Sequence, residues 1–206
     1  MGVACGAHML HDGYTDLLYV LLPLWQAEFG LGYAEVGLLR ALFAGSMAGF
    51  QVPAAAVAER IGGPLMLGLG TALVGVGYLA AGASAGYLML TVALVLAGLG
   101  ASVQHPIAAN LVAQAFPGRR SRAALATYNF SGDLGKMAFP ALTAGLVALM
   151  PWRSATMVLG MMALAAAAAA SAIMPSTIVA LRHGITASNP AVSAGKAILP
   201  RSPEKL

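Results

Sequence analysis

Hydrophobic residues run along this chain in long continuous segments, without the alternation of apolar and polar positions that marks a half-buried strand. Short links rich in glycine, proline and charged residues separate the segments. A helix needs roughly 20 apolar residues to cross the hydrocarbon core of a bilayer, and each segment approaches or exceeds that length. The pattern predicts an all-α integral membrane protein. Its six expected spans are about residues 3–27, 34–58, 65–83, 87–115, 123–149 and 154–174.

Composition agrees with a membrane protein and excludes several other classes. Of the 206 residues, 59% are hydrophobic and 9% are charged, whereas soluble domains are about 25% charged. The single cysteine, Cys5, excludes an intrachain disulfide and a four-cysteine metal site. No nucleophile elbow, phosphate-binding glycine loop or dinucleotide fingerprint is present. We therefore expect neither an enzyme nor a cofactor.

The short links predict antiparallel neighbouring helices, packed as one bundle over residues 1–175. Residues 176–206 are expected to form a tail without helical periodicity. Basic residues favour the cytoplasmic side of membrane proteins. They concentrate on the second and fourth links and on the tail, while the other side has mainly Arg153, so both termini are expected in the cytoplasm. The basic residues of the two links are Arg60, Arg119, Arg120 and Arg122.

Polar side chains in the first segment recur at helical spacing. His8, Asp12 and Asp16 follow one another at i, i+4 and i+8, so they share a helix face. Ionisable groups at membrane depth usually face a bundle interior or a wet cavity, which predicts a substrate or proton path. The alternative is that headgroups wet this segment. His8, His11 and Asp12 also have the spacing of a helical metal site, a third and weaker interpretation, and we expect no metal.

The fifth segment begins with the stretch YNFSGDLGK, which places an Asp and a Lys inside an apolar run. Asn129, Asp133 and Lys136 lie at i, i+4 and i+7, on one helix face, and Asp133 and Lys136 can pair directly. One interpretation is an ion pair that neutralises itself and lowers the cost of insertion. The other is a switch that opens when Asp133 is protonated or when an anion binds Lys136.

The second and fourth segments carry further polar candidates. In VQHPIAANL, His105 precedes Pro106, which removes a backbone hydrogen bond from the helix. His105 is either a structural residue beside a kink or a proton carrier, since histidine titrates near neutral pH. Arg40 pairs either with Glu35 on its own helix or with a carboxylate of another helix.

Several motifs resemble the major facilitator superfamily. QVPAAAVAERIGGP, between the second and third segments, resembles the family's cytoplasmic loop motif, roughly Gly-x-x-x-Asp-Arg-x-Gly-Arg-Arg. Glu59 stands for the Asp, Arg60 and Gly62 are in place, and the trailing basic pair is missing. WRSA resembles the usual start of helix six. ASVQHPIAANLVAQAFPGRRSRAALATYNFSGDLGK resembles helices four and five of drug-efflux members, especially the fosmidomycin-resistance-like subgroup.

This resemblance implies a 3+3 inverted repeat. Helices one and four would line a central cavity, and helix five would face that cavity or a second half. Glu59, Arg60 and Gly62 would act as a conformational latch. The residues then expected to bind substrate or couple protons are Asp12, Asp16, His105, Asn129, Asp133 and Lys136, with His11, Arg40 and Gln51 as secondary candidates.

The implied function is secondary active transport of a small organic solute across the inner (cytoplasmic) membrane. It would be proton-coupled efflux by alternating access between two bundles. Family members usually have twelve helices, so a second six-helix half, from another copy or another chain, is an expected partner besides lipid, solute and protons. Nucleic acid is not. The alternatives are a truncated transporter fragment and a non-transporting membrane interaction or scaffold protein.

Overall fold

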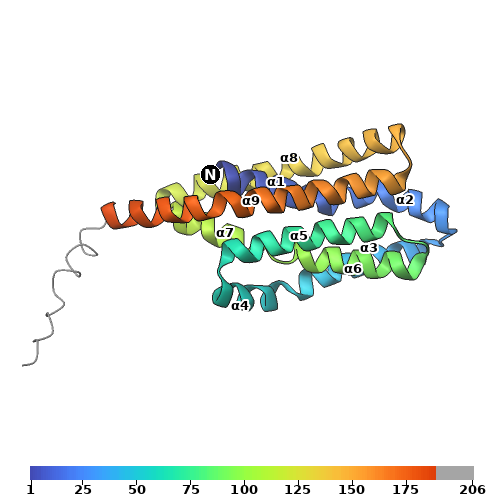
Figure 1. Cartoon of the computed structure of the whole chain (residues 1–206), viewed down its shortest axis with the longest axis horizontal. Coiled ribbons are helices and arrows are strands. Elements are labelled where there is room, and N and C mark those ends of the chain that lie inside the picture. Colours follow the sequence, from blue (N-terminus) through green and yellow to red (C-terminus); the bar gives the residue numbers. More distant parts are fainter. Residues whose placement is uncertain (189–206) are drawn as a thin grey trace, which may run out of the picture. The chain divides into compact units, whose positions relative to one another are not determined.

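In the computed structural model, residues 1–188 are described, and side chains as far as residue 172. The described residues form helices joined by short turns, with no strand (Figure 1). These helices are α1 (Gly2–Asp16), α2 (Leu18–Phe29), α3 (Tyr33–Gly49), α4 (Gln51–Ile61), α5 (Gly63–Gly82), α6 (Tyr87–Ala101), α7 (Gln104–Ala115), α8 (Arg119–Leu149) and α9 (Trp152–Ser188).

Three of the expected spans are interrupted helices. The first divides into α1 and α2 at Leu17, the second into α3 and α4, and the fourth into α6 and α7. Proline cannot donate to the carbonyl four residues earlier and clashes with it. Pro106 therefore accounts for the break after α6, as the sequence indicated, and Pro53 accounts for the 42° bend between α3 and α4.

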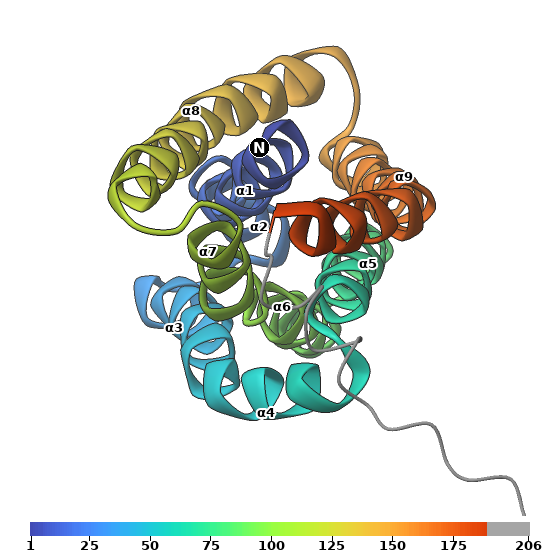
Figure 2. The same ribbon diagram turned by 90° about the vertical axis from the view of Figure 1, so that its left-hand side faces the viewer.

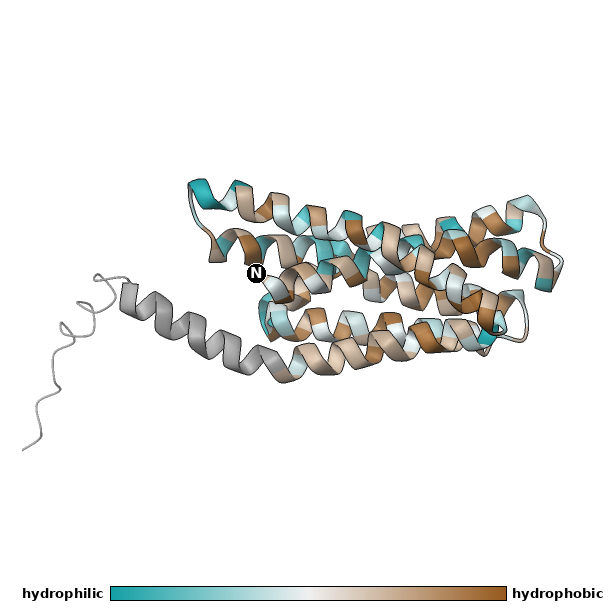
Figure 3. Ribbon diagram, turned by 90° about the horizontal axis from the view of Figure 1, so that it is seen from above, coloured by the Kyte–Doolittle hydropathy of each residue, from teal (hydrophilic) through white to brown (hydrophobic). Residues whose placement is uncertain are grey.

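Length and apolar composition qualify three described helical segments to cross a membrane: α5, the stretch of α6 and α7, and residues 152–172 of α9. The bent pair α3–α4 makes a fourth if it counts as one span. The other two expected spans, α1–α2 and α8, contain the polar residues of the site. In Figure 3, hydrophobic colours cover most of the ribbon, and a hydrophilic group lies partway along the helices.

The turns of the chain lie at two opposite ends of the bundle. The turns after α2, α5 and α8 lie at one end, and those after α4 and α7 lie at the other, together with the N-terminus (Figure 1). Successive passes are therefore antiparallel, as expected from the short links. Figure 2, an end-on view, shows α1 between α8 and α7, and α1 contacts both of them.

Buried aromatic side chains tie α1 to α5 and α9 at the centre of the bundle. Tyr14 and Tyr78 are almost fully buried, and the Tyr78 hydroxyl donates to the Tyr14 carbonyl at 2.6 Å. The Tyr14 hydroxyl in turn donates to the Leu159 carbonyl. Buried hydroxyls need such partners, because an unsatisfied polar group costs about 1–3 kcal/mol. These bonds fix the end of α1 close to the break at Leu17.

Glycines allow the closest helix contacts. A Cβ atom on Gly75 of α5 would lie 2.8 Å from the Gly160 carbonyl oxygen of α9, and one on Gly160 would lie equally close to the Gly75 oxygen. On α8, a Cβ atom at Gly135 would overlap the main chain of Met9 in α1. Small residues let helices approach closely where lipid provides no hydrophobic drive for association. Gly75 belongs to the glycine-rich stretch GLGTALVGVG of α5.

The C-terminal part differs from the expected tail. The chain divides into one compact unit, Met1–Ala170, and a second that starts at Ser171. Helix α9 continues to Ser188, so the prediction that helical structure ends near residue 175 is wrong for residues 176–188. The preceding alanine-rich run, ALAAAAAASA, has the highest helix propensity, and extending an existing helix is easier than nucleating one. The rest of the expected tail lies outside the described residues.

Arg153 joins three elements at the end of the bundle opposite the N-terminus. It donates to the Ser84 carbonyl, pairs with Glu28 at 3.0 Å and lies over the Trp152 ring. Replacing Arg153 with leucine is expected to destabilise the bundle by about 1.5–3 kcal/mol, the usual contribution of a hydrogen bond to a charged group. Thermal unfolding in detergent measures this. Leucine at the exposed Arg119 is the matched control, and an equal loss there would contradict the role of Arg153.

Candidate functional site

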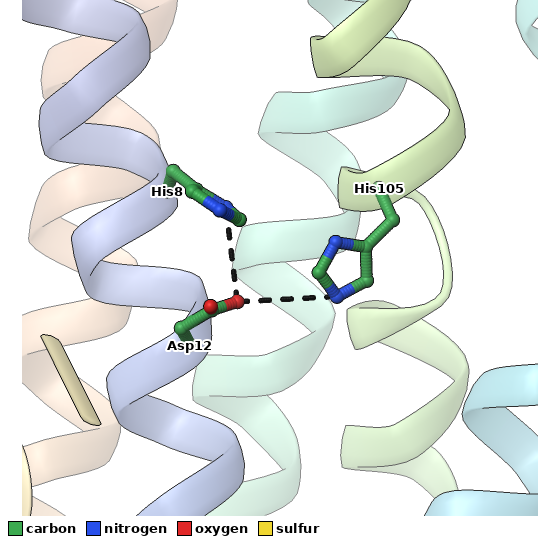
Figure 4. A group of neighbouring side chains, drawn as sticks. All are labelled: His8, Asp12 and His105. Atoms are coloured by element: carbon green, nitrogen blue, oxygen red, sulfur yellow. Dashed lines mark ion pairs between the residues drawn. The ribbon is translucent and has the colours of Figure 1, made fainter. Parts of the chain in front are cut away.

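Asp12 is the centre of a polar cluster shared by α1, α7 and α8. Its side chain is only 5% exposed, and its carboxylate lies 3.3 Å from the Lys136 ammonium. His8 Nδ1 is 3.7 Å and His105 Nε2 is 3.9 Å from the same carboxylate, at its other oxygen. Figure 4 shows His8 and Asp12 on one helix and His105 facing them from a second. The structure thus brings together side chains far apart in the sequence.

Lys136 bridges two carboxylates of different burial. Its ammonium lies 3.1 Å from Asp133, as the spacing within α8 predicted, and 3.3 Å from Asp12 on α1. The Asp133 side chain is 69% exposed and that of Lys136 is 43% exposed. The pair in YNFSGDLGK is therefore not self-contained, because Lys136 also neutralises a buried carboxylate of another helix.

His8 is held in position by α8. Its ring stacks on Tyr128, with 3.9 Å between ring centroids and 8° between planes. A Cβ atom on Gly132 would lie 2.5 Å from an Asp12 carboxylate oxygen and 2.6 Å from His8 Nε2. Glycine at this position therefore leaves the room that the two polar side chains occupy. His8, Asp12 and His105 also form a set of possible metal ligands.

His11 faces the bundle interior. It is 7% exposed, and its ring meets the His105 ring edge-on, with 4.9 Å between centroids. Its Nε2 atom and Gln104 Nε2 are buried without a hydrogen-bond partner. Both residues line a cavity of about 10 Å³. That volume is about enough for one water molecule and far too small for an organic solute.

Neither expected partner of Arg40 is seen, because within the described residues no carboxylate lies at ion-pair distance from it and its hydrogen-bond partner is a tyrosine hydroxyl of α2. Glu35 caps α3 by accepting a hydrogen bond from the Gly32 amide at 2.7 Å. Arg40 instead donates to the Tyr19 hydroxyl at 3.4 Å and interacts electrostatically with Asp16. Asp16 also interacts with Lys136.

The other candidates lie outside the cluster. Asn129 is exposed on α8, and no hydrogen bond or ion pair joins it to Asp12 within the described part of the chain. Gln51 is the first residue of α4, at the bend from α3. Glu59 and Arg60 are exposed in the last turn of α4. Gly62 follows with a φ of 95°, in the region that glycine adopts without strain. A latch role for these three residues stays a prediction.

Sequence reasoning missed two residues of the site, Tyr128 and Gly132. Both belong to the buried face of α8, which continues with Gly135 and Phe139. This face was visible as small and aromatic residues at helical spacing, between the positions of the charged face. The charged residues alone indicated the exposed face of α8 and gave no sign of its buried face.

Comparison with known proteins agrees with this architecture. The family model of the Major Facilitator Superfamily matches residues 4–202. The chain therefore belongs to this superfamily of membrane transporters, and the resemblance expected from its motifs is confirmed. It is a multi-pass membrane protein of a transporter family and not a member of an enzyme family.

One relative is the fosmidomycin resistance protein of Escherichia coli (strain K12). The two sequences are 29% identical over 150 residues, which cover 72% of this chain and 36% of the relative. The chain thus spans about a third of the length of this curated relative. The match agrees with the subgroup that helices four and five resembled.

Proposed function

We propose that this chain forms one half of a secondary active transporter that moves a small organic solute across the inner membrane. Transport is outward, coupled to protons and driven by alternating access of two bundles. The observation that carries the proposal is the position of Asp12. A buried carboxylate contacts a half-exposed lysine and faces a half-exposed histidine, at the side where α1, α7 and α8 meet.

Asp12 is placed to exchange a proton for an ion pair. When ionised, it holds Lys136 at 3.3 Å. A proton on Asp12 removes one of the two carboxylates that hold the ammonium, the other being Asp133 at 3.1 Å. The ammonium can then attract an anionic group of the solute at the exposed side. His8 lies 3.7 Å from Asp12 but is buried. His105 lies 3.9 Å away with a side chain that is 46% exposed, so it is the histidine placed to deliver that proton from the open side. Intramembrane ionisable clusters of this kind mark ion and proton paths in transporters.

The arrangement of the turns supports a topology with both termini in the cytoplasm. Arg60, Arg119 and Arg120 lie at the turns that share one end with the N-terminus (Figure 1). The positive-inside rule assigns such an end to the cytoplasm. The expected six spans follow if α1–α2 and α8 also cross the bilayer, their polar residues being covered by one another and by the second half. The 3+3 repeat remains part of this proposal.

A second half completes the solute site. Phe130 and Met137 of α8 are exposed beside the polar cluster, at 62% and 74%. An apolar surface with a few polar groups is typical of a small-molecule site, and it needs an opposite wall. That wall is a second copy of this chain or another six-helix bundle.

Two measurements on the purified chain test the proposal. Native mass spectrometry after release from detergent is expected to show a dimer or a complex with a second bundle. Liposomes containing the chain and a pH-sensitive dye are expected to show proton movement when a solute gradient is applied. The relative is named for resistance to fosmidomycin, so this compound is the first solute to test. A monomer without solute-dependent proton movement would contradict the proposal and favour the scaffold interpretation.

A further inference from the structure

Three possible metal ligands converge where α1 and α7 meet. His8, Asp12 and His105 each offer one atom, and the three atoms lie within 4.8 Å of one another (Figure 4). His8 Nδ1 and His105 Nε2 are 3.7 Å and 3.9 Å from Asp12 Oδ1. These distances are too long for hydrogen bonds. The three atoms are therefore close together without being hydrogen-bonded to one another.

The separations suit a transition-metal ion. Bonds of about 2.1 Å in tetrahedral geometry place neighbouring ligand atoms about 3.4 Å apart, so a small inward movement of the side chains would close the site. His8 Nδ1 is buried without a hydrogen-bond partner. A metal ion would satisfy that atom, which otherwise carries the cost of an unmade bond.

We propose that His8, Asp12 and His105 bind one divalent transition-metal ion, with Zn²⁺, Ni²⁺ and Co²⁺ as the candidates. Two imidazoles and one carboxylate are ligands that these ions favour, whereas Mg²⁺ takes oxygen ligands. The Tyr128 ring stacks on His8 and fixes the plane of its imidazole. The side chain of His105 is 46% exposed, so the ion can enter from the open side and keep a coordination position for water or another ligand.

Lys136 limits the affinity of this site without occupying it. Its ammonium lies 3.3 Å from Asp12 Oδ2 and leaves Oδ1 for the ion. Repulsion from the ammonium weakens cation binding, although Asp133, which lies 3.1 Å from that ammonium, offsets part of its charge. Because the ligands must be deprotonated, binding is expected to weaken as the pH falls.

The proposed site differs from the one that sequence spacing suggested, because His11 is not one of its ligands. His8, His11 and Asp12 have metal-like spacing on one helix, but His11 points toward the interior cavity with Gln104. His105, from a different helix, takes its place in the set. If the first set binds the ion, alanine at His11 should abolish binding and alanine at His105 should not. If the second set binds it, the reverse is expected.

The test is isothermal titration calorimetry of the purified full chain, without a polyhistidine tag, with Zn²⁺, Ni²⁺ and Mg²⁺. One equivalent of Zn²⁺ or Ni²⁺ is expected to bind, and no Mg²⁺. Mutating a residue that only supports a metal ligand usually lowers metal affinity by about tenfold or more. His105→Ala and Asp12→Asn remove ligands themselves, so they should weaken binding by at least about tenfold. His11→Ala should leave it unchanged.

Co²⁺ gives a second readout that does not depend on transport. Tetrahedral coordination is expected to give a strong visible absorption that His105→Ala removes. Gly132→Ala, which crowds Asp12 and His8, should lower the affinity although it replaces no ligand. Binding that persists in both His105→Ala and Asp12→Asn, or that His11→Ala abolishes, would overturn the site. These results would leave the transport proposal untouched, since they measure binding alone.

Discussion

Replacing Asp12 with asparagine is expected to abolish solute-dependent proton movement while the helix bundle remains folded. Asparagine keeps the size of the side chain but cannot release a proton or attract Lys136. The ammonium retains Asp133 at 3.1 Å and is partly exposed, so the lost ion pair should cost about 1 kcal/mol or less. Flux in dye-loaded liposomes and the thermal midpoint in detergent measure the two effects on one preparation.

The matched control for this variant is Glu28→Gln. Glu28 is also a paired carboxylate, but it binds Arg153 at the opposite end of the bundle from the N-terminus. This control is expected to lower stability slightly and to leave the flux unchanged. If Asp12→Asn retains the flux, Asp12 does not couple protons to transport. If it lowers stability and assembly while flux is absent from the unmodified chain as well, the cluster is structural and the scaffold interpretation is favoured.

The local features of this site were predictable from the sequence because they depend on residues within one or two helical turns. The common face of Asn129, Asp133 and Lys136 follows from the helical repeat, and all three are exposed on α8 as a set. The break before Pro106 follows from the missing amide hydrogen. The apolar segments identified helices of nearly the right extent.

The partners of the charged residues were not predictable in the same way. Helical spacing indicated Asp133 as a neighbour of Lys136. It could not indicate Asp12, since that contact depends on how closely α8 approaches α1. Two glycines with no charge, Gly132 and Gly135, determine that approach. Likewise, Glu35 was the nearest carboxylate to Arg40 along its helix, yet it caps α3. Pairing between distant residues depends on how the helices pack, and the spacing of residues within one helix carries no information on that packing.

Replacing Gly135 with valine is expected to prevent α1 and α8 from packing as they do here. A Cβ atom at this position would overlap main-chain atoms of Met9, and a backbone cannot rotate away as a side chain can. Overpacking of a side-chain contact typically costs about 1–3 kcal/mol, so this change should reach or exceed the upper limit. The expected result is a lower thermal midpoint and loss of the monodisperse fraction in size-exclusion chromatography.

Gly145→Val is the control on the same helix, because a Cβ atom there meets nothing within 4 Å. It should keep the stability of the unmodified chain, and equal stability of both variants would show that α1 and α8 do not pack through Gly135.

Replacing Gly135 with alanine, a smaller change than valine, would also be informative. Asp12 and Lys136 belong to the two helices that pack through Gly135. The methyl group of alanine should push α1 and α8 slightly apart and so weaken the ion pair before the bundle unfolds. Proton movement should then fall at a temperature where the chain is still folded. That result would show that proton coupling depends on the close contact between α1 and α8.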